Sequence, residues 1–207
     1  MTTTTQPTPL RLDYTPTHCP VIRKARKYTA QERQCWRTPN TPDQPVLWLV
    51  AQALGGEIGL DPTADDARSV PAHWHITRDQ NCLVTPWYRV GAPKTAFMNP
   101  EFCAPHLFVD RLCDELHGGN ITEAIALLKI GTLANQKTGA MIAHYAEAIC
   151  CWSAGKPKAN GRIAFIDADG NQVRGGDFDS CLVYFGPRYA RFLEVFSDYG
   201  LVSEVVA

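Results

Sequence analysis

The segment from Ala124 to Ile130 constrains the fold of this chain more than any other feature. It is almost entirely apolar, which is typical of a strand buried on both faces of a sheet. Such a strand needs other elements packed over both of its faces. A helical pattern from about Gln136 to Ala146 follows it, and then a second apolar strand from Ala148 to Trp152. The sequence therefore predicts an α/β fold with a mostly parallel sheet covered by helices on both faces.

The chain before Ala124 shows the same alternation of strand and helix patterns. The expected elements are a helix that begins at Thr41-Pro42 and ends at Gly55-Gly56, a strand from 57 to 61, a strand from 94 to 98 and a helix from 108 to 116. Residues 62–93 are polar and punctuated by prolines, so we expect loops there with one short helix or strand.

The end of the chain predicts a different arrangement. Residues 161–166 and 181–185 have strand character and are separated by Asp169-Gly170-Asn171 and a glycine-rich link, which favours an antiparallel hairpin. A last helix is expected from about Arg188, with Gly200 at its end.

Composition limits the class of protein. The 207 residues are 45% hydrophobic and 20% charged, which suits one globular domain and excludes wholesale disorder. No run of 18 apolar residues is present, and the Thr- and Pro-rich segment from Met1 to Leu12 has no signal-peptide pattern. The eight cysteines are scattered, which favours reduced, packed thiols. We therefore expect a cytoplasmic protein that does not span a membrane.

Charge is distributed unevenly along the chain. Residues 1–40 carry seven basic and two acidic residues, whereas residues 167–207 carry three basic and seven acidic ones. We interpret residues 1–35 as a basic, flexible arm and residues 36–207 as the folded domain. The cluster of Arg23, Lys24, Arg26 and Lys27 can neutralise nucleic-acid phosphates, although a solvated tail explains it equally well.

Polar residues that follow the predicted strands are the candidates for chemistry, because ligands of open α/β sheets bind at the carboxyl ends of the strands. Three segments stand out: Leu60-Asp61-Pro62-Thr63, Met98-Asn99-Pro100-Glu101-Phe102, and Trp36-Arg37-Thr38-Pro39 before the first helix. An Asn oxygen and a Pro carbonyl presented together can accept both hydrogens of one amino group, and an aromatic ring two residues later can stack on a flat base. The middle segment therefore indicates a site for an exocyclic amine.

These segments resemble the phage-type DNA N-6-adenine methyltransferases, from about Trp36 to Val202. The matching motifs are Trp36-Arg37-Thr38-Pro39, Leu60-Asp61-Pro62, Asn99-Pro100-Glu101-Phe102, Gly161-Arg162-Ile163-Ala164-Phe165, and the segments 183–186 and 191–196. The resemblance implies a Rossmann-like class I methyltransferase, S-adenosylmethionine as cofactor and DNA as partner. It also implies a cytoplasmic protein encoded by a phage or its bacterial host.

The resemblance assigns roles to individual residues. Asn99 and Pro100 would hold the adenine N6 amine, Glu101 would stand beside them, and Phe102 would stack on the base. The implied cofactor-binding residues are Trp36, Thr38, Pro39, Asp61, Pro62, Asp79 and Asn99. Arg162 is expected to contact a phosphate or to form a structural ion pair. Because the target atom is hidden inside a duplex, the base must be flipped out or single-stranded.

One departure from the family keeps other functions open. The family has a second proline where this chain has Glu101, which frees φ and adds a backbone N–H. The glycine-rich cofactor loop of many methyltransferases is also missing, although Gly55, Gly56 and Gly59 precede Asp61. The alternative is a methyltransferase-like DNA- or protein-binding protein with impaired catalysis. A third possibility is methyl transfer to another amine, such as that of a protein Gln or a different base.

Other constellations carry less weight. Cys103, His106, Cys113 and His117 fall on one face of a single predicted helix, and a straight stripe cannot surround a zinc ion tetrahedrally, so we expect no metal site. The sequence contains neither a phosphate-binding G-x-x-x-x-G-K-[ST] loop nor a Ser or Cys nucleophile elbow. Their absence argues against NTPases and hydrolases.

Overall fold

The computed structural model describes residues 37–153, 162–167, 169–173 and 179–206, and these residues form a mixed α/β fold around one seven-stranded sheet. The strands are β1 (Ile58–Ala64), β2 (Ala72–Thr77), β3 (Thr95–Met98), β4 (Glu123–Lys129), β5 (Ala148–Trp152), β6 (Ser180–Phe185) and β7 (Gly200–Glu204). The helices are α2 (Val46–Ala53), α3 (Pro105–His117), α4 (Gln136–Tyr145) and α5 (Tyr189–Phe196), with short 3-10 turns η1 (Arg78–Gln80) and η2 (Ile130–Thr132).

The sheet has the strand order β2-β1-β3-β4-β6-β5-β7. Strands β2, β1, β3 and β4 pair in parallel, as expected from the sequence. Strand β6 is antiparallel to both β4 and β5, and β7 is antiparallel to β5. The first half of the sheet is therefore parallel and the second half is antiparallel.

The predicted hairpin between residues 161–166 and 181–185 is wrong. In the described part of that segment, only Ile166 forms β-bridges, one with Arg37 and one with Gln172. Strand β6 is buried along its whole length and has β4 on one edge and β5 on the other. Because both of its edges are occupied, no edge remains for residues 162–166, which instead lie beside Arg37.

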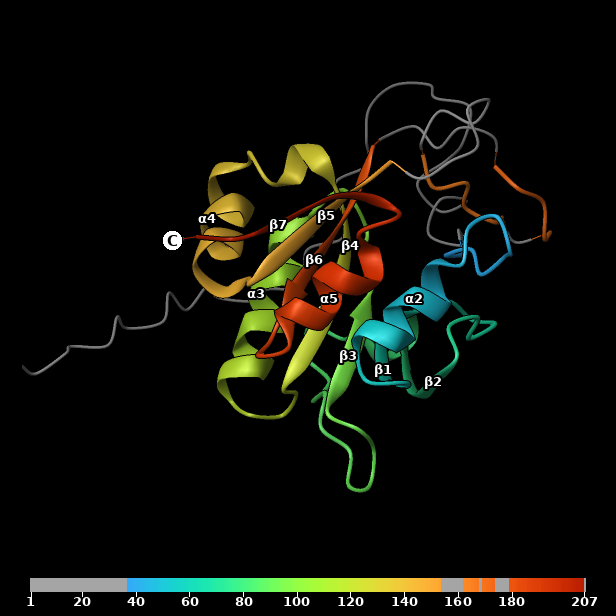
Figure 1. Cartoon of the computed structure of the whole chain (residues 1–207). Coiled ribbons are helices and arrows are strands. Elements are labelled where there is room, and N and C mark those ends of the chain that lie inside the picture. Colours follow the sequence, from blue (N-terminus) through green and yellow to red (C-terminus); the bar gives the residue numbers. More distant parts are fainter. Residues whose placement is uncertain (1–36, 154–161, 168, 174–178, 207) are drawn as a thin grey trace, which may run out of the picture.

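Helices cover both faces of the sheet, as predicted (Figure 1). Alternating side chains of β4 show the two layers: Ile125 and Leu127 pack on the face with α2 and α5, whereas Ala126 and Leu128 pack on the face with α3 and α4. The buried strand from Glu123 to Lys129 thus occupies the centre of the molecule. In the described residues, no helix has the length and apolarity that crossing a membrane requires.

Several element boundaries differ from the sequence prediction. Helix α2 begins at Val46, because Thr41 and Gln44 first form a tight turn with reciprocal backbone hydrogen bonds of 3.1 and 3.0 Å. Strand β1 continues past Asp61 to Ala64, with an irregularity in its pairing between these residues. Gly200 begins β7, where it pairs with Trp152 of β5, and does not end a helix. An added Cβ there would lie 2.2 Å from the Cys151 carbonyl oxygen, so this pairing requires glycine.

Gly59 brings β1 close to the segment that leads into β3. A Cβ at this position would lie only 2.0 Å from the Pro93 carbonyl oxygen, so only glycine fits. The Gly59 N–H also donates to Thr95 Oγ1 at 2.9 Å. This close approach fixes the positions of β1 and β3 relative to each other, and the carboxyl ends of these two strands carry the candidate site.

Most described cysteines behave as packed thiols. Five described cysteines form no disulfide: Cys82, Cys113, Cys150, Cys151 and Cys181. Burial raises the pKa of Cys82 to about 12, so this thiol is not ionised to a reactive thiolate at neutral pH. Cys103 is disulfide-bonded, so the expectation of reduced thiols is wrong at that position.

Candidate active site

The candidate site lies at the carboxyl ends of β1 and β3, where Thr63 joins two of the predicted segments. Leu60 of β1 pairs with Ala96 of β3, so the residues that follow them lie side by side. The Thr63 hydroxyl donates to Asp61 Oδ1 at 3.3 Å and accepts the Asn99 backbone N–H at 2.9 Å. One hydroxyl therefore connects the acidic segment of β1 to the Asn-Pro segment after β3.

The Asn99 side chain has one satisfied end and one unsatisfied end. Its Nδ2 donates to Thr38 Oγ1 at 3.2 Å, which fixes the amide orientation. Its Oδ1 is buried and accepts no hydrogen bond in the described structure. A buried acceptor without a donor costs about 1–3 kcal/mol, and such exceptions in native proteins call for an explanation. An acceptor of this kind is what recognition of an amino group requires.

Thr38 is buried beside Asn99 because the preceding residue is held on two sides. The Arg37 backbone N–H donates to the Ile166 carbonyl at 2.7 Å, and the Ile166 N–H donates back at 3.0 Å. The Arg37 guanidinium Nε lies 3.4 Å from Asp65 Oδ2, just beyond the end of β1. The segment Thr38-Pro39 therefore lies beside Asn99 and close to the end of β1.

Residues 162–166 also contact the chain between Pro39 and α2, at Gln44. The Gln44 amide donates to the Arg162 carbonyl at 3.0 Å and accepts the Ala164 N–H at 2.8 Å. The predicted phosphate ligand Arg162 forms an ion pair with Asp179 at 2.8 Å between Nε and Oδ1. Of the two interpretations of Arg162, the structure contains the ion pair.

Asp61 is a buried carboxyl group, 3% exposed, in the middle of the site. Its Oδ1 accepts the Thr63 N–H at 3.0 Å as well as the Thr63 hydroxyl. Burial raises its pKa from 3.8 to about 7, the two hydrogen bonds from Thr63 oppose this change, and the nearby Asp65 charge adds to it. A cationic or hydroxyl-bearing ligand would stabilise the ionised form.

The residues after Asn99 line the more exposed side of the site. Pro100 is buried, whereas Glu101 and Phe102 are partly exposed. Glu101 Oε2 lies 3.5 Å from Cys103 Sγ, and the Lys129 ammonium lies 5.1 Å from the centre of the Phe102 ring. Lys129 ends β4, the strand next to β3. Lys129 was missed by the sequence analysis, although it follows the apolar residues of β4 at the strand end. Thr63 belongs to one of the predicted segments, but its hydrogen bonds to both Asp61 and Asn99 were not predicted.

Other predicted residues have no direct interaction with the centre of the site. Asp79 is exposed in η1 after β2, and among the described residues it forms no hydrogen bond with Asp61 or Asn99. Trp36, Arg23, Lys24, Arg26 and Lys27 lie outside the described residues. Within the described residues, no cluster of three or more His, Cys, Asp or Glu side chains could hold a metal ion.

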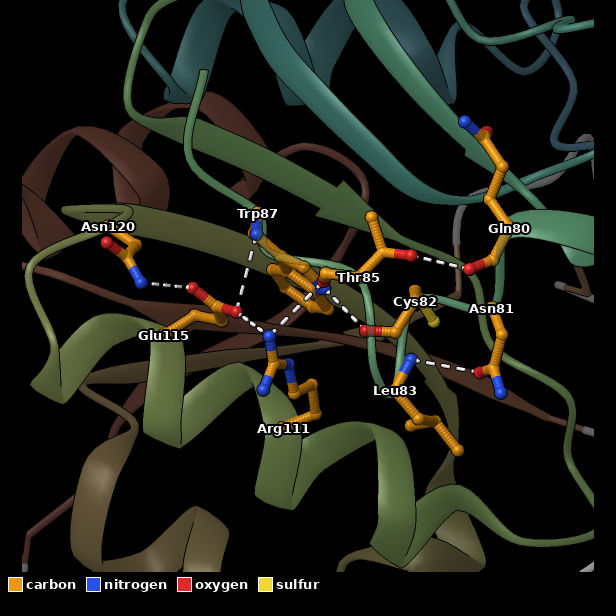
Figure 2. Close-up of polar contacts among 9 residues, drawn as sticks. All are labelled: Gln80, Asn81, Cys82, Leu83, Thr85, Trp87, Arg111, Glu115 and Asn120. Atoms are coloured by element: carbon orange, nitrogen blue, oxygen red, sulfur yellow. Dashed lines mark hydrogen bonds and ion pairs between the residues drawn. The ribbon is translucent and has the colours of Figure 1, made fainter. Parts of the chain in front are cut away.

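A buried polar network fixes the connection between β2 and β3 against α3 (Figure 2). Arg111 pairs with Glu115 and donates through Nη2 to the Thr85 carbonyl at 3.2 Å. Glu115, only 2% exposed, accepts the Trp87 N–H at 3.4 Å and the Asn120 amide at 2.7 Å. This segment, expected to be mainly loop, therefore has a rigid attachment to the helix that follows the Asn-Pro motif.

The Trp87 ring is the apolar half of the same attachment. It is buried in the layer with α3 and α4, and its Nε1 donates to the Cys82 carbonyl at 2.9 Å. The preceding turn is closed by the Leu83 N–H, which donates to Asn81 Oδ1 at 3.1 Å (Figure 2). Sequence periodicity gave no signal for this network, because its members are scattered over a loop and a helix.

Comparison with known proteins identifies the family. Comparison with curated proteins gives no match. The family model described as DNA N-6-adenine-methyltransferase (Dam) matches residues 26–199, which is most of the 207-residue chain and includes every segment of the candidate site. The chain therefore belongs to the DNA N-6-adenine-methyltransferase (Dam) family.

Proposed function

We propose that this protein transfers a methyl group from S-adenosylmethionine to the N6 atom of adenine in DNA. The observation that carries the proposal is the buried Asn99 Oδ1, an acceptor without a donor at the carboxyl end of β3. Membership of the family supports DNA adenine as the substrate class. The alternation of strands and helices with an antiparallel second half supports a Rossmann-like class I methyltransferase domain.

Asn99 and Pro100 act on the target amine by accepting its hydrogens. Asn99 Oδ1 takes one N6 hydrogen and the Pro100 carbonyl takes the other, which withdraws the N6 lone pair from the ring and turns it toward the methyl donor. Thr38 keeps Asn99 in this orientation, because its Oγ1 already accepts from Asn99 Nδ2. A strong general base is unnecessary, since the amine attacks first and releases its proton to water afterward.

The residues around Asp61 fit a cofactor of this kind. S-adenosylmethionine supplies a methyl group on positively charged sulfur, together with an ammonium group and ribose hydroxyls that need acceptors. The Asp61 carboxyl is buried beside Asn99 and has a raised pKa, so ligand donors would stabilise its ionised form. We propose Thr38, Pro39, Asp61 and Pro62 as its neighbours, with Trp36 and Asp79 as further contacts.

DNA is the proposed partner, and the target base must leave the duplex to reach Asn99. Phe102 would stack on the flipped adenine and so offset part of the few kcal/mol that unstacking costs. The Lys129 ammonium lies 5.1 Å from the centre of the Phe102 ring, which adds a positive charge next to the proposed position of the base. Residues 1–35 are the proposed basic arm, with Arg23 to Lys27 on the phosphates, and residues 36–207 the domain.

A second candidate function follows from Glu101. Its carboxylate replaces a proline of the family beside Asn99, and a partly exposed negative charge at this point would repel DNA phosphate. The chain would then bind DNA or protein through the same fold without efficient methyl transfer.

Incubation with labelled S-adenosylmethionine and unmethylated DNA, followed by nucleoside analysis, tests the proposal. We expect label in N6-methyl-2′-deoxyadenosine from DNA and none in matched RNA or protein samples. Label only in protein or RNA would assign the reaction to another amine. Cofactor binding without any incorporation would assign the second candidate function.

Glu101→Pro distinguishes the two candidates further. Proline fits only where φ is near about -65° and the replaced N–H is unpaired. If the wild type is active, the variant should keep or raise its turnover, measured by methyl incorporation into DNA. Activity that appears only in the variant would make the natural protein the binding form, whereas loss of an existing activity would give Glu101 a role of its own.

A further inference from the structure

An open pocket of about 240 Å³ lies apart from the residues around Asn99, on the edge strand β2. Its lining residues are Arg68, His73, Trp74, His75, Gln80 and Arg89. His75 of β2 is in register with Asp61 of β1, so the pocket is level with the candidate site along the strands. The pocket therefore lies on the strand next to the candidate site and is not part of that site.

Two guanidinium groups give the pocket its charge. Arg68 and Arg89 are exposed, and no carboxylate among the described residues forms an ion pair with either. By contrast, four other arginines of the described chain form ion pairs with carboxylates: Arg37, Arg111, Arg162 and Arg188. The pocket thus concentrates positive charge that the protein itself does not neutralise.

The aromatic wall holds one of these cations in place. Arg89 stands over the Trp74 ring at 5.9 Å from its centre, and Trp74 packs against the core layer of α3 and α4. Stacking on a tryptophan orients a guanidinium but uses none of its N–H groups. These donors remain available to an anionic ligand, and the planar fork of arginine matches phosphate oxygens.

The two histidines of the pocket are already engaged. His73 Nε2 lies 2.8 Å from Glu57 Oε2, and His75 Nε2 lies 2.8 Å from the Val70 carbonyl. The Glu57 carboxylate is thereby turned to His73 and does not pair with either arginine. Arg68 and Arg89, with the neutral amide of Gln80, are the groups left to bind a ligand.

We propose that this pocket binds a backbone phosphate of the substrate DNA. The inference rests on the proposed function, because it takes its occupant from the same substrate. Strands β2 and β3 are two positions apart in the sheet, which at about 4.8 Å per strand is about 10 Å. Duplex DNA carries a charge about every 1.7 Å along its axis. A duplex whose flipped adenine lies at Asn99 therefore has phosphates within about 10 Å of that base, the distance from β3 to β2.

The experiment is a salt titration of DNA binding with a labelled unmethylated duplex, using the full chain and the double variant Arg68→Gln/Arg89→Gln. Each phosphate contact contributes about 0.9 to the slope of log affinity against log salt concentration. We expect the slope of the double variant to be smaller by about 1 to 2, with weaker binding to every sequence. The KM for DNA should rise while kcat and S-adenosylmethionine affinity stay unchanged.

Two matched variants control for charge and for stacking. Lys137→Gln/Arg191→Gln removes the same charge from exposed positions on α4 and α5 and should leave the slope unchanged. Arg68→Lys/Arg89→Lys keeps the charge and should keep most of the slope. Thermal melting of each variant checks that the fold is intact, which exposed positions favour.

The results separate this inference from the function on which it rests. A slope that is unchanged in the Arg68/Arg89 variant, while the wild type binds and methylates DNA, would overturn the phosphate site alone. An equal decrease in the Lys137/Arg191 variant would also overturn it, because the effect would then follow net charge only. A wild type that neither binds nor methylates DNA would overturn both proposals.

Discussion

Asn99 combines a stabilising contact with a destabilising one in a single side chain. Its Nδ2 reaches Thr38, whereas its Oδ1 is buried without a donor. Replacing an unpaired buried acceptor by an apolar group relieves a desolvation penalty, so folding alone does not favour an amide here. The residue is better explained by a ligand that supplies the missing donor.

Asn99→Ala should lower the turnover of DNA methylation by at least about a hundredfold, the scale seen when one preorganised polar group is deleted. S-adenosylmethionine binding should survive, because the proposed cofactor residues Asp61 and Thr38 remain. Nucleoside analysis and calorimetry measure the two effects. Thr38→Val, which removes the hydroxyl that accepts from Asn99 Nδ2, serves as a milder comparison. Unchanged methylation in Asn99→Ala would show that the site is elsewhere.

Asp61 should make stability depend on pH. Its pKa is raised by burial from 3.8 to about 7, so between these values the folded state binds more protons than the unfolded state. Stability therefore falls as the pH rises from about 4 to about 7, and the loss is complete above the folded pKa. Asp61→Asn should remove this dependence and should melt at a higher temperature than the wild type at pH 8.

Melting curves of both proteins between pH 4.5 and 8 check this prediction, with Asp66→Asn, an exposed acid in the following loop, as a control. Ligand binding adds a second readout, because donors of the cofactor favour the ionised carboxylate. The affinity of the wild type for S-adenosylmethionine should rise as the pH passes through about 7. Parallel melting curves for wild type and Asp61→Asn would contradict the buried carboxyl.

At the scale of elements, the position of the site depends on attachments between segments far apart in the chain. Gly59 allows β1 and the start of β3 to approach, and the Arg111–Glu115 pair fastens the β2–β3 connection to α3. Both β3 and α3 adjoin the Asn-Pro motif, so the network stabilises the motif on either side. The Arg111–Glu115 pair is an i,i+4 pair within α3, but its contacts with the β2–β3 connection and the close approach at Gly59 join separate elements.

Arg111→Ala should destabilise the fold by on the order of 3 kcal/mol, because it leaves the buried Glu115 carboxylate without its cation. Glu115→Ala should cost less, since Arg111 is partly exposed and reaches water. The double variant should be less unstable than the two single effects added together. Urea unfolding of the four proteins measures this coupling, and strictly additive effects would show that the pair contributes little.

At the scale of the whole molecule, the proposed DNA contacts come from two places. The basic cluster from Arg23 to Lys27 precedes the described residues, and the pocket of Arg68 and Arg89 lies on the edge strand β2. Together they would supply the positive charge that a chain of net charge -1 needs in order to bind DNA. The contribution of the arm can be measured separately from that of the pocket.

Deletion of residues 1–28 should weaken DNA binding to a similar extent for all sequences and should reduce the salt dependence of the affinity. S-adenosylmethionine binding should not change, because the proposed cofactor segments begin at Trp36. Fluorescence anisotropy at several salt concentrations measures the effect. A truncated protein with the wild-type slope would assign the arm to a solvated tail.

Local patterns were sufficient for most elements. The apolar segments predicted β4 and β5 within one residue at each end, and helical periodicity predicted α3 and α4. They failed where a contact with a distant segment decided the outcome, as for residues 162–166, which lie beside Arg37 and do not form the predicted hairpin. Strand β7 was missed because it is a short edge strand, mostly exposed, in which only Leu201 and Val202 are apolar, too few to form a strand pattern.

The sequence by itself determined the α/β class, the family resemblance and the segments that carry the candidate chemistry, because apolar periodicity and short motifs are local properties of the chain. The antiparallel second half of the sheet exceeds the single antiparallel hairpin that the sequence predicted. Only the tertiary structure decided how these segments meet. The contacts of Asn99 with Thr63 and Thr38 span 36 and 61 residues, and the partners of β6 lie in two separate strands. Such pairings depend on packing over the whole molecule, which no local pattern encodes.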